Sequence, residues 1–159
     1  MPHRTADLYD RLADQLQVAE PLFRDFGKHR QFEGKIATLK VFEDNSLVRT
    51  RLEIDSPGTV LVVDGGGSLR CALLGDQLAQ LAVDRHFSGI LIFGCIRDST
   101  ILAGLPIGIK ALATIPVKSI KRGEGQADVP VRFAGIEFRP GDYFYADDDG
   151  IVTTKTPVA

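Results

Sequence analysis

Residues 59–95 change pattern twice, and this change constrains the fold more than any other part of the sequence. TVLVVD (59–64) is rich in β-branched residues, as buried strands are, and three glycines follow it directly. Apolar residues then recur at helical spacing before a second apolar run, GILIFGC (89–95). Because this run contains no polar residue, it predicts a strand covered on both faces of a sheet and parallel to the first. The order strand, helix, strand favours an α/β protein.

The segments before this unit predict further elements. TADLYDRLADQL (5–16) places three leucines four residues apart behind Thr5, a candidate N-cap, which predicts an amphipathic helix packed on the core. GKIATLKVFEDNSLVRTRLE (34–53) predicts a strand, a turn at residues 43–45, and a second element that is compatible with either helix or strand.

Strand patterns dominate the C-terminal part. IGIKALA (107–113) and ATIPVKSI (113–120) predict two short strands, with prolines as breaks. Residues 131–154 alternate apolar and polar residues between Gly- and Asp-containing turns, which predicts antiparallel strands. The chain of 159 residues has no evident linker or repeat, so we expect one domain, residues 1–159, with helices packed on a mixed sheet.

The charge and the apolar runs of the chain argue against nucleic-acid binding and against a membrane span. A net charge of −2, with Lys and Arg scattered along the chain, provides no basic surface for DNA or RNA. The first residues lack the apolar core of a signal peptide, and every apolar run is shorter than the roughly 18 residues of a spanning helix. We therefore expect a cytoplasmic protein. Cys71 and Cys95 lack metal-binding spacing and are expected to be buried thiols.

Several patterns resemble known sites without matching them. Gly65–Gly67 follows a strand but fits no phosphate-loop pattern, so we expect a tight turn that also lets a small anion approach the backbone. Asp147–Asp149 lacks the alternating acids of a calcium loop, and a β-turn is the better interpretation. Lys110 is a conceivable Schiff-base nucleophile, although lysines that extend from a strand to the surface are commoner. No metal-binding or catalytic pattern is formed by His3, His29 and His86.

Two pairs of residues that contain charges remain, and both adjoin apolar segments. Gly75 and Asp76 stand at the start of the predicted helix, and Arg97 and Asp98 come directly after the second strand. Open α/β sheets bind ligands at the carboxyl ends of their strands, so these four residues are candidates for one site. Helix capping and a surface ion pair are the alternative explanations, and the residues alone leave both open.

The same segment resembles the RraA-like family, which includes metal-dependent 4-hydroxy-4-methyl-2-oxoglutarate aldolases. Twenty residues separate Asp76 from the pair Arg97 and Asp98, which resembles the D-x20-R-D signature of that family. EPLFRDFG, VFEDNSLV, ATIPV and GDYFYADDDGI are also similar to family sequences, so the resemblance covers nearly the whole chain. It implies an α/β/β/α sandwich of the swivelling phosphohistidine-domain type. It also implies a homotrimer or a dimer of trimers, with sites near the subunit interfaces.

The resemblance further implies a role for each candidate residue. Arg97 would hold the pyruvyl part of a 2-oxo acid substrate, and Asp98 would anchor a divalent cation, Mg²⁺ or Mn²⁺, directly or through water. Asp76 would support the hydrated metal. The backbone expected to bind the substrate carboxylate is that of Gly75, Asp76, Gln77 and Leu78.

The implied chemistry is cleavage of a carbon–carbon bond beside a 2-oxo group, which leaves a pyruvate enolate. A cation and a guanidinium together stabilise the negative charge of that enolate. The expected activity is aldol cleavage of 4-hydroxy-4-methyl-2-oxoglutarate to two pyruvates. Because decarboxylation of oxaloacetate gives the same enolate, we expect oxaloacetate decarboxylase activity as well.

A second branch of the family provides the main alternative. Its members bind ribonuclease E or its helicase partners and inhibit RNA processing without doing chemistry, and the short length of this chain resembles them. That branch can lose the acid after the arginine, whereas CIRDS retains Asp98, which favours the enzyme. A Schiff-base aldolase acting through Lys110 and a purely structural trimer are the remaining alternatives.

Overall fold

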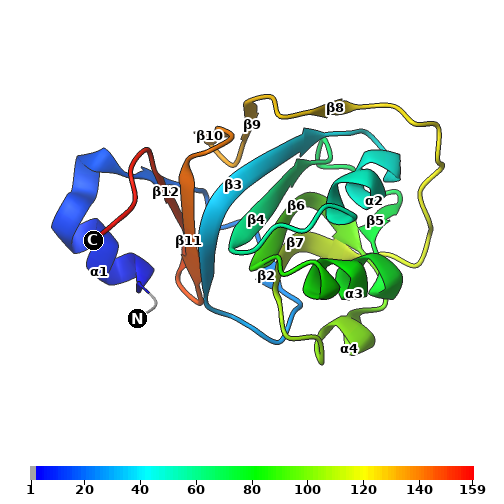
Figure 1. Ribbon diagram of the computed structural model, residues 1–159, viewed down its shortest axis with the longest axis horizontal. Helices are drawn as coiled ribbons and strands as arrows, with labels where there is room; N and C mark the ends of the chain where they lie inside the picture. Colours follow the sequence, from blue (N-terminus) through cyan, green and yellow to red (C-terminus); the bar gives the residue numbers. More distant parts are fainter. Residues whose placement is uncertain (1–2) are drawn as a thin grey trace.

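Residues 3–159 are described by the computed structural model of the protein, which is built around one large sheet (Figure 1). Its main path runs β1-β12-β11-β3-β4-β6-β7-β2, with β5 paired to β6 and β8 to β3, while β9 and β10 form a separate two-stranded sheet. The strands are β1 (Gln17–Val18), β2 (Arg24–Asp25), β3 (Phe32–Lys40), β4 (Thr59–Asp64), β5 (Ala72–Leu74), β6 (Gly89–Ile96), β7 (Gly108–Thr114), β8 (Gln126–Ala127), β9 (Val131–Phe133), β10 (Ile136–Phe138), β11 (Tyr143–Asp147) and β12 (Gly150–Thr154). The helices are α1 (Thr5–Leu12), the short 3-10 helix η1 (Ala13–Gln15), α2 (Ser46–Leu52), α3 (Asp76–Asp84) and α4 (Ser99–Leu102). None of the helices within residues 3–159 has the length and apolar character needed to cross a membrane.

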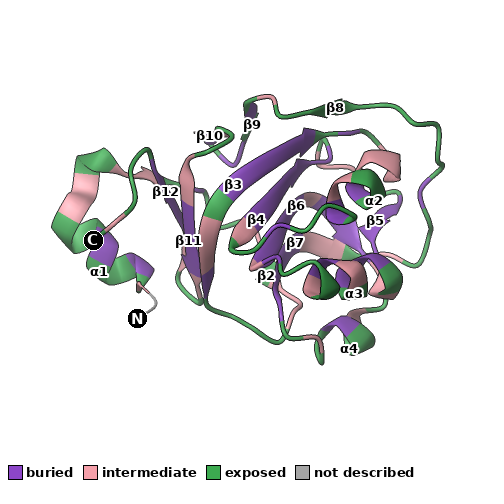
Figure 2. Cartoon of the chain, viewed as in Figure 1, coloured by how far each residue is buried: buried purple, intermediate pink, exposed green. Residues whose placement is uncertain are grey.

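The centre of the sheet is parallel, as the sequence predicts. β3, β4, β6 and β7 run in the same direction, with Val60 of β4 opposite Gly89 of β6. Alternate residues of β4 enter two different cores: Leu61 and Val63 join the cluster under α2 and α3, whereas Val60 and Val62 join the cluster on the other side. All four side chains are fully buried, as are most residues of the central strands (Figure 2). Burial on both faces explains why this segment has no polar alternation.

A second layer covers the far side of the parallel strands. The sheet continues from β3 into antiparallel β11 and β12, which pack together with the β9–β10 hairpin. Aromatic rings fill the space between the layers: the ring centroid of Phe133 lies 4.8 Å from that of Phe93 and 4.6 Å from that of Phe138. α1 covers the outer face of β11 and β12, where Leu8 packs against Tyr145. The layer order is α/β/β/α, and the predicted mixed α/β sandwich is confirmed.

The structure settles one assignment that the sequence left open and corrects one that it predicted. The segment that was compatible with helix or strand is the helix α2, because Val48 and Leu52 lie one turn apart and are both fully buried. The prediction of a second strand over residues 113–120 was wrong. β7 ends at Thr114, and residues 115–125 form a segment without helix or strand, which we call the strap. Its one β-type contact among the described residues is an isolated bridge between Lys118 and Ala72. Pro116 has no N–H for a sheet, and almost all strap side chains are exposed.

The N-terminus of α1 is capped in a way that the sequence does not indicate. Thr5 was expected to be the N-cap, but Arg4 holds that position and Thr5 is the first helical residue. The backbone N–H and the hydroxyl of Thr5 donate to the two carboxylate oxygens of Asp147, at 2.8 and 2.6 Å. The acceptor comes from β11, at the other end of the chain, so no local pattern could reveal it.

Candidate active site

β5 and β6 end side by side and bring the pair Gly75 and Asp76 next to the pair Arg97 and Asp98. The backbone N–H of Arg97 donates to the carbonyl of Leu74 at 2.9 Å, so the next residue, Gly75, lies beside Arg97. Asp76 begins α3, and its backbone N–H donates to Asp98 Oδ2 at 3.0 Å. The structure therefore places Gly75 and the three residues of the D-x20-R-D signature at the carboxyl edge of the sheet.

Because Gly75 has no side chain, the side chains of Arg97 and Asp98 can lie close to its backbone. A Cβ atom built on Gly75 would lie 2.8 Å from Asp98 Oδ2 and 3.4 Å from Arg97 Cγ. The backbone of Gly75 is extended, with φ −132°, so conformational freedom is not the reason for a glycine here. The reason is the close approach of two charged side chains.

Asp98 turns the chain sharply at the end of β6. Its φ of 59° and ψ of 37° lie in the left-handed region, which Asp and Asn enter more readily than most residues. Its carbonyl then accepts the backbone N–H groups of Ile101 and Leu102 in α4, both at 3.0 Å. This turn directs the carboxylate of Asp98 back toward the start of α3, which is why it can accept the N–H of Asp76.

The first turn of α3 was predicted to bind a substrate carboxylate through its backbone. The N–H of Asp76 donates to Asp98, and the N–H of Gln77 donates to the side chain of Asp76 at 2.8 Å. Both acids thus cap the helix, and a ligand that used the same amides would have to displace them. The side chain of Gln77 is exposed, whereas that of Leu78 is buried in the core, so Leu78 can contribute only its backbone.

A cavity of about 140 Å³ opens beside Arg97 and Asp98. The cationic side chains that line it come from three elements and number more than its two acids, so it is suited to an anion. They are Arg49, Arg97, Lys118 and Lys121. Asn45 also lines the cavity: its Nδ2 donates to the Leu73 carbonyl at 3.3 Å, while its buried Oδ1 has no hydrogen-bond partner among the described residues. A buried amide oxygen without a partner is uncommon and is available to a ligand donor.

The sequence analysis missed the residues that α2 and the strap bring to this cavity. Asn45 is the N-cap of α2, and Arg49 lies within that helix. Lys118 and Lys121 belong to the strap. No spacing rule connects these positions with Arg97, because they meet only through the tertiary fold. The one available signal was the polar turn EDNS before α2, a segment that resembles family sequences.

In the glycine turn after β4, the backbone N–H groups all donate to acceptors within the protein. Gly65 and Gly67 donate their N–H groups to the carbonyl of Phe93, both at 3.1 Å, and Gly66 donates to Asp64 Oδ1 at 2.9 Å. The expected turn is confirmed. The expected approach of an anion to this backbone is not supported, because all three donors already have protein acceptors.

Lys110 lies far from this cavity, in the middle of β7. Its side chain is only 5% exposed, its Nζ lies 3.1 Å from Asp25 Oδ1, and it donates to the Asp147 carbonyl at 3.0 Å. Asp25 Oδ1 makes no hydrogen bond of good geometry, so we treat the contact as an ion pair of opposite charges. A lysine paired in this way holds β2, β7 and β11 together and is not presented to a substrate.

The other candidates are also structural in position. Asp147–Asp149 forms the turn between β11 and β12, as expected, and both cysteines are buried, where desolvation raises the pKa of each thiol. His3 contacts Glu33 and His86 contacts Asp55. None of these residues lines the cavity beside Arg97.

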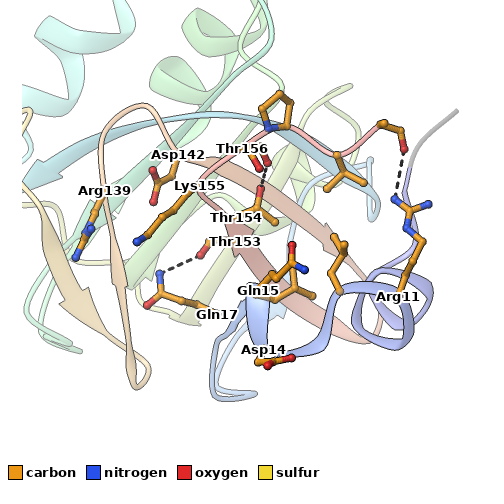
Figure 3. A pocket seen from close by; sticks show the side chains of 15 residues that line it. Arg11, Asp14, Gln15, Gln17, Arg139, Asp142, Thr153, Thr154, Lys155 and Thr156 are labelled. Carbon is orange, nitrogen blue, oxygen red and sulfur yellow. Dashed lines mark hydrogen bonds between the residues drawn. The ribbon is translucent and has the colours of Figure 1, made fainter.

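A larger cavity lies at the opposite end of the molecule, between α1, η1 and the segment after β12 (Figure 3). It measures about 870 Å³, but several of its polar groups are already paired. Gln17 Nε2 donates to Thr153, Thr154 donates to the Thr156 carbonyl, and Arg139 pairs with Glu137 outside the cavity. We prefer the smaller cavity as the candidate site, because its charged groups converge.

Comparisons with known proteins agree on the family and differ in the names of its members. The model of a family described as RraA-like, Aldolase/RraA, matches residues 5–153. A protein of Laribacter hongkongensis (strain HLHK9), provisionally named 4-hydroxy-4-methyl-2-oxoglutarate aldolase, is 55% identical over 158 residues and 99% of each chain.

Two solved structures are similar over almost their whole length. One is an S-adenosylmethionine: 2-dimethylmenaquinone methyltransferase from Geobacillus kaustophilus HTA426, with TM-score 0.97 and 53% identity over 98% of this chain and 97% of that one. The other is the RNA-processing inhibitor RraA from Thermus thermophilis, with TM-score 0.96 and 45% identity over 100% of this chain and 96% of that one. Three activities are thus named on one fold, so the activity has to be argued from the site. The family itself is shown: this protein belongs to the RraA-like family.

Proposed function

We propose that the protein is a divalent-metal-dependent lyase that cleaves 4-hydroxy-4-methyl-2-oxoglutarate into two molecules of pyruvate. The observation that carries this proposal is the convergence of Arg97, Asp76 and Asp98 on one small, cationic cavity. Relatives about half identical to the chain, provisionally named as aldolases of this substrate, support the same activity.

Asp76 and Asp98 have the chemistry of ligands for Mg²⁺ or Mn²⁺. These hard cations prefer oxygen ligands, and Mg²⁺ usually keeps several waters while it binds one or two carboxylates. Residues 3–159 contain no cluster of three or more His, Cys, Asp or Glu side chains suited to a metal. Two carboxylates are sufficient for a hydrated cation, with Asp98 as its anchor and Asp76 as support for its waters. When bound, the cation supplies positive charge for the oxygen of the 2-oxo group.

Arg97 supplies the second positive charge. Its planar guanidinium stays protonated and can hold the substrate carboxylate and the 2-oxo oxygen at two points. Cleavage breaks the bond between C3 and C4, the 4-hydroxyl loses its proton, and the electron pair of the broken bond forms the pyruvate enolate. Charge that develops on that enolate lies beside Arg97, and we assign Asp76 to assist removal of the hydroxyl proton. Return of one proton to C3 of the enolate gives the second pyruvate, so the reaction has no net gain or loss of protons.

The surplus of cations at the cavity favours a substrate with two carboxylates. Arg97 holds the carboxylate next to the 2-oxo group, and Arg49, Lys118 and Lys121 provide charge for the second one. Oxaloacetate is also a 2-oxo dicarboxylate, and its decarboxylation leaves the same enolate. We therefore propose oxaloacetate decarboxylation as a secondary activity.

The other two named activities fit the candidate site less well. S-adenosylmethionine has the size of ligands whose pockets usually span 300–1,000 Å³, and the cavity at Arg97 is about 140 Å³. Regulation of ribonuclease E is the second candidate function, and its support is the 45% identity to the inhibitor RraA. A non-catalytic regulator has no need of an acid beside Arg97, whereas Asp98 is present and held at the site.

We further propose that copies of the chain assemble through an apolar rim beside the site, as a trimer or a dimer of trimers. We use the name apolar rim for Phe42, Leu69, Val117 and Ile120, each more than half exposed. Val117 and Ile120 lie on the strap, and the ring of Phe42 packs near Gly66 in the turn after β4. Exposed apolar side chains that gather in one region usually mark a contact surface.

The decisive experiment measures pyruvate release from 4-hydroxy-4-methyl-2-oxoglutarate and from oxaloacetate, with Mg²⁺, with Mn²⁺ and with chelator. Asp98→Ala should lower kcat/KM at least about 100-fold, because it removes the proposed metal anchor. Asp84→Ala is the matched control: Asp84 is an exposed acid at the other end of α3 and should leave turnover unchanged. Oxaloacetate also needs a protein-free control for its spontaneous decarboxylation.

Normal turnover by Asp98→Ala would refute the role of this acid, and turnover that survives the chelator would refute the metal dependence. Absence of turnover on both substrates would refute the lyase. In that case, binding to purified ribonuclease E would be measured next, with Asp98→Ala expected to bind as the wild type does.

A further inference from the structure

The buried acid Asp44 fastens the strap to the turn before α2. Asp44 is 3% exposed, and its Oδ2 accepts the backbone N–H groups of Arg122 and Glu124 at 2.8 and 3.1 Å. Its Oδ1 accepts the backbone N–H and the hydroxyl of Ser46 at 2.9 and 2.6 Å. Ser46 Oγ in turn accepts the N–H of Gly123 at 3.1 Å. One carboxylate thus connects three consecutive strap residues to the start of α2.

The two halves of the strap are held differently. The first half is attached to the sheet edge: the Val117 carbonyl accepts the N–H of Ala72 at 2.7 Å, and Lys118 forms an isolated β-bridge with Ala72. The second half has no such bridge among the described residues.

Residues 120–128 are all exposed, so the strap buries little apolar surface that could hold it in place. Ser119 is the buried exception, at 4% exposure, and its hydroxyl accepts the N–H of Asn45 at 3.3 Å. The Ile120 N–H donates to the Glu43 carbonyl at 3.2 Å. Hydrogen bonds to residues 43–46 therefore determine where this part of the strap lies.

We propose that Asp44 is a positioning residue for the candidate site: by fastening the second half of the strap, it holds Lys121 at the cavity beside Arg97. Lys121 lines that cavity and directly precedes Arg122, whose N–H the carboxylate binds, whereas Lys118 is held by its bridge to Ala72. The effect on substrate binding rests on the proposed function, whereas the attachment of the strap by Asp44 does not.

The charge of Asp44 supports a permanent attachment. Burial alone would raise the pKa of this carboxyl, but the hydrogen bonds from Ser46, Glu124 and Arg122 outweigh burial and lower the pKa to about 2. Asp44 stays ionised at any pH near neutrality. Hydrogen bonds to an ionised acceptor are also stronger than those to a neutral one.

The test compares Asp44→Asn with Asp147→Asn. Asp147 is a matched control, because its carboxylate also accepts several hydrogen bonds and fastens another segment, the start of α1. Asp44→Asn should speed hydrogen exchange at Arg122, Gly123 and Glu124 by at least about tenfold relative to wild type. Asp147→Asn should leave exchange at these three amides within about twofold of wild type.

Kinetics on 4-hydroxy-4-methyl-2-oxoglutarate then separate positioning from a structural role. Asp44→Asn should raise KM about tenfold and change kcat less than about threefold, because Lys121 binds substrate and transition state alike. Asp44→Glu, which keeps the charge, should recover part of the lost KM. Asp147→Asn should keep the wild-type KM.

Each outcome decides a defined part of the proposal. Unchanged strap exchange in Asp44→Asn would overturn the fastening, and faster exchange with an unchanged KM would overturn the positioning role. A wild-type protein that turns over neither substrate would refute the proposed function instead. Exchange at the strap would then still support or overturn the fastening by Asp44.

Discussion

Gly75 illustrates how a single residue without a side chain determines the geometry of the candidate site. The carboxylate of Asp98 and the side chain of Arg97 occupy the volume that a methyl group at position 75 would need. The nearest atom, Asp98 Oδ2, is the end of a side chain that can rotate, so the fold tolerates a substitution better than the site does.

Gly75→Ala should therefore damage activity more than stability. We expect kcat/KM for pyruvate release to fall at least about tenfold, because the methyl group displaces Asp98 from the N–H of Asp76. The free energy of unfolding should fall by only about 1 kcal/mol, which is typical of alanine at an N-cap. Urea denaturation and steady-state kinetics on the same preparation measure both quantities.

Gly104→Ala is the control for this substitution. The nearest atom to a Cβ at Gly104 is the Ile101 carbonyl oxygen at 3.6 Å, an ordinary contact distance. This variant should retain wild-type kcat/KM. A Gly75→Ala protein with full activity would mean that the position of the Asp98 carboxylate is unimportant for the reaction.

Single residues of the site differ in how far the sequence identifies them. Asp76, Arg97 and Asp98 could be predicted to meet, because each adjoins an apolar strand or helix whose pattern is local. Lys121 could not be, since it lies on a strap that has no periodicity and reaches the cavity through contacts with Asp44. The metal and substrate roles of the first three residues stay predictions until the kinetics are measured.

Among the secondary-structure elements, the edge formed by β2 and β7 depends on a buried ion pair. Asp25 on β2 is 8% exposed and Lys110 on β7 is 5% exposed, and their charged atoms lie 3.1 Å apart. β2 has only two residues, so few backbone hydrogen bonds hold it on the sheet. Asp25 Oδ2 also lies 3.6 Å from the exposed Arg30, but removing Lys110 takes away the only buried partner, among the described residues, of a buried carboxylate.

Lys110→Met should lower the free energy of unfolding by about 3–5 kcal/mol. The melting temperature should fall by roughly 6–20 °C, at about 2–4 °C per kcal/mol for a chain of this size. Calorimetry measures both. Lys28→Met, at an exposed lysine, should change stability by less than about 0.5 kcal/mol.

The double variant Asp25→Leu with Lys110→Met tests the physical reason. With no buried charge left at this edge, and with the exposed Arg30 free to turn to solvent, it should recover more than half of the lost stability. The same proteins address the Schiff-base alternative: borohydride with pyruvate should label neither wild type nor Lys110→Met. Covalent labelling of the wild type that disappears in Lys110→Met would contradict our assignment of Lys110 as structural.

Elements with local periodicity were the predictable part of the fold. β4, α3 and β6 show their burial directly in the spacing of apolar residues. β2 and β8, with two residues each, exist only because distant strands offer them an edge. The cap of α1 likewise depends on Asp147, so pattern analysis of neighbouring residues could not locate it.

At the scale of the whole molecule, the apolar rim predicts association of the chain with itself. Leu69 belongs to the rim and is 57% exposed. It directly precedes Arg70, whose Nε lies 2.6 Å from Oε2 of Glu43, the residue after Phe42. This contact brings Leu69 close to Phe42 of the rim. We expect light scattering to give the mass of a trimer or a hexamer for the wild type. Leu69→Asp should shift the population to monomers, because it places a charge in an apolar contact.

The exposed Ile54 supplies the control for this experiment. Ile54 is 55% exposed but follows α2, outside the rim, so Ile54→Asp should keep the wild-type mass. A monomeric wild type would refute the proposed assembly. A Leu69→Asp protein of unchanged mass would place the contact elsewhere on the surface.

The path of the sheet has a consequence for synthesis of the chain on the ribosome. β3, made early, has an edge that β11 covers, and the inner face of α1 packs on side chains of β11 and β12. About a hundred residues must be translated between β3 and β11, which takes on the order of ten seconds at usual rates. Until Tyr143–Thr154 leave the exit tunnel, the nascent protein presents an open strand edge and an uncovered helix face. These two surfaces are where a chaperone would bind first during translation, and where two growing chains on one messenger RNA would join by mistake.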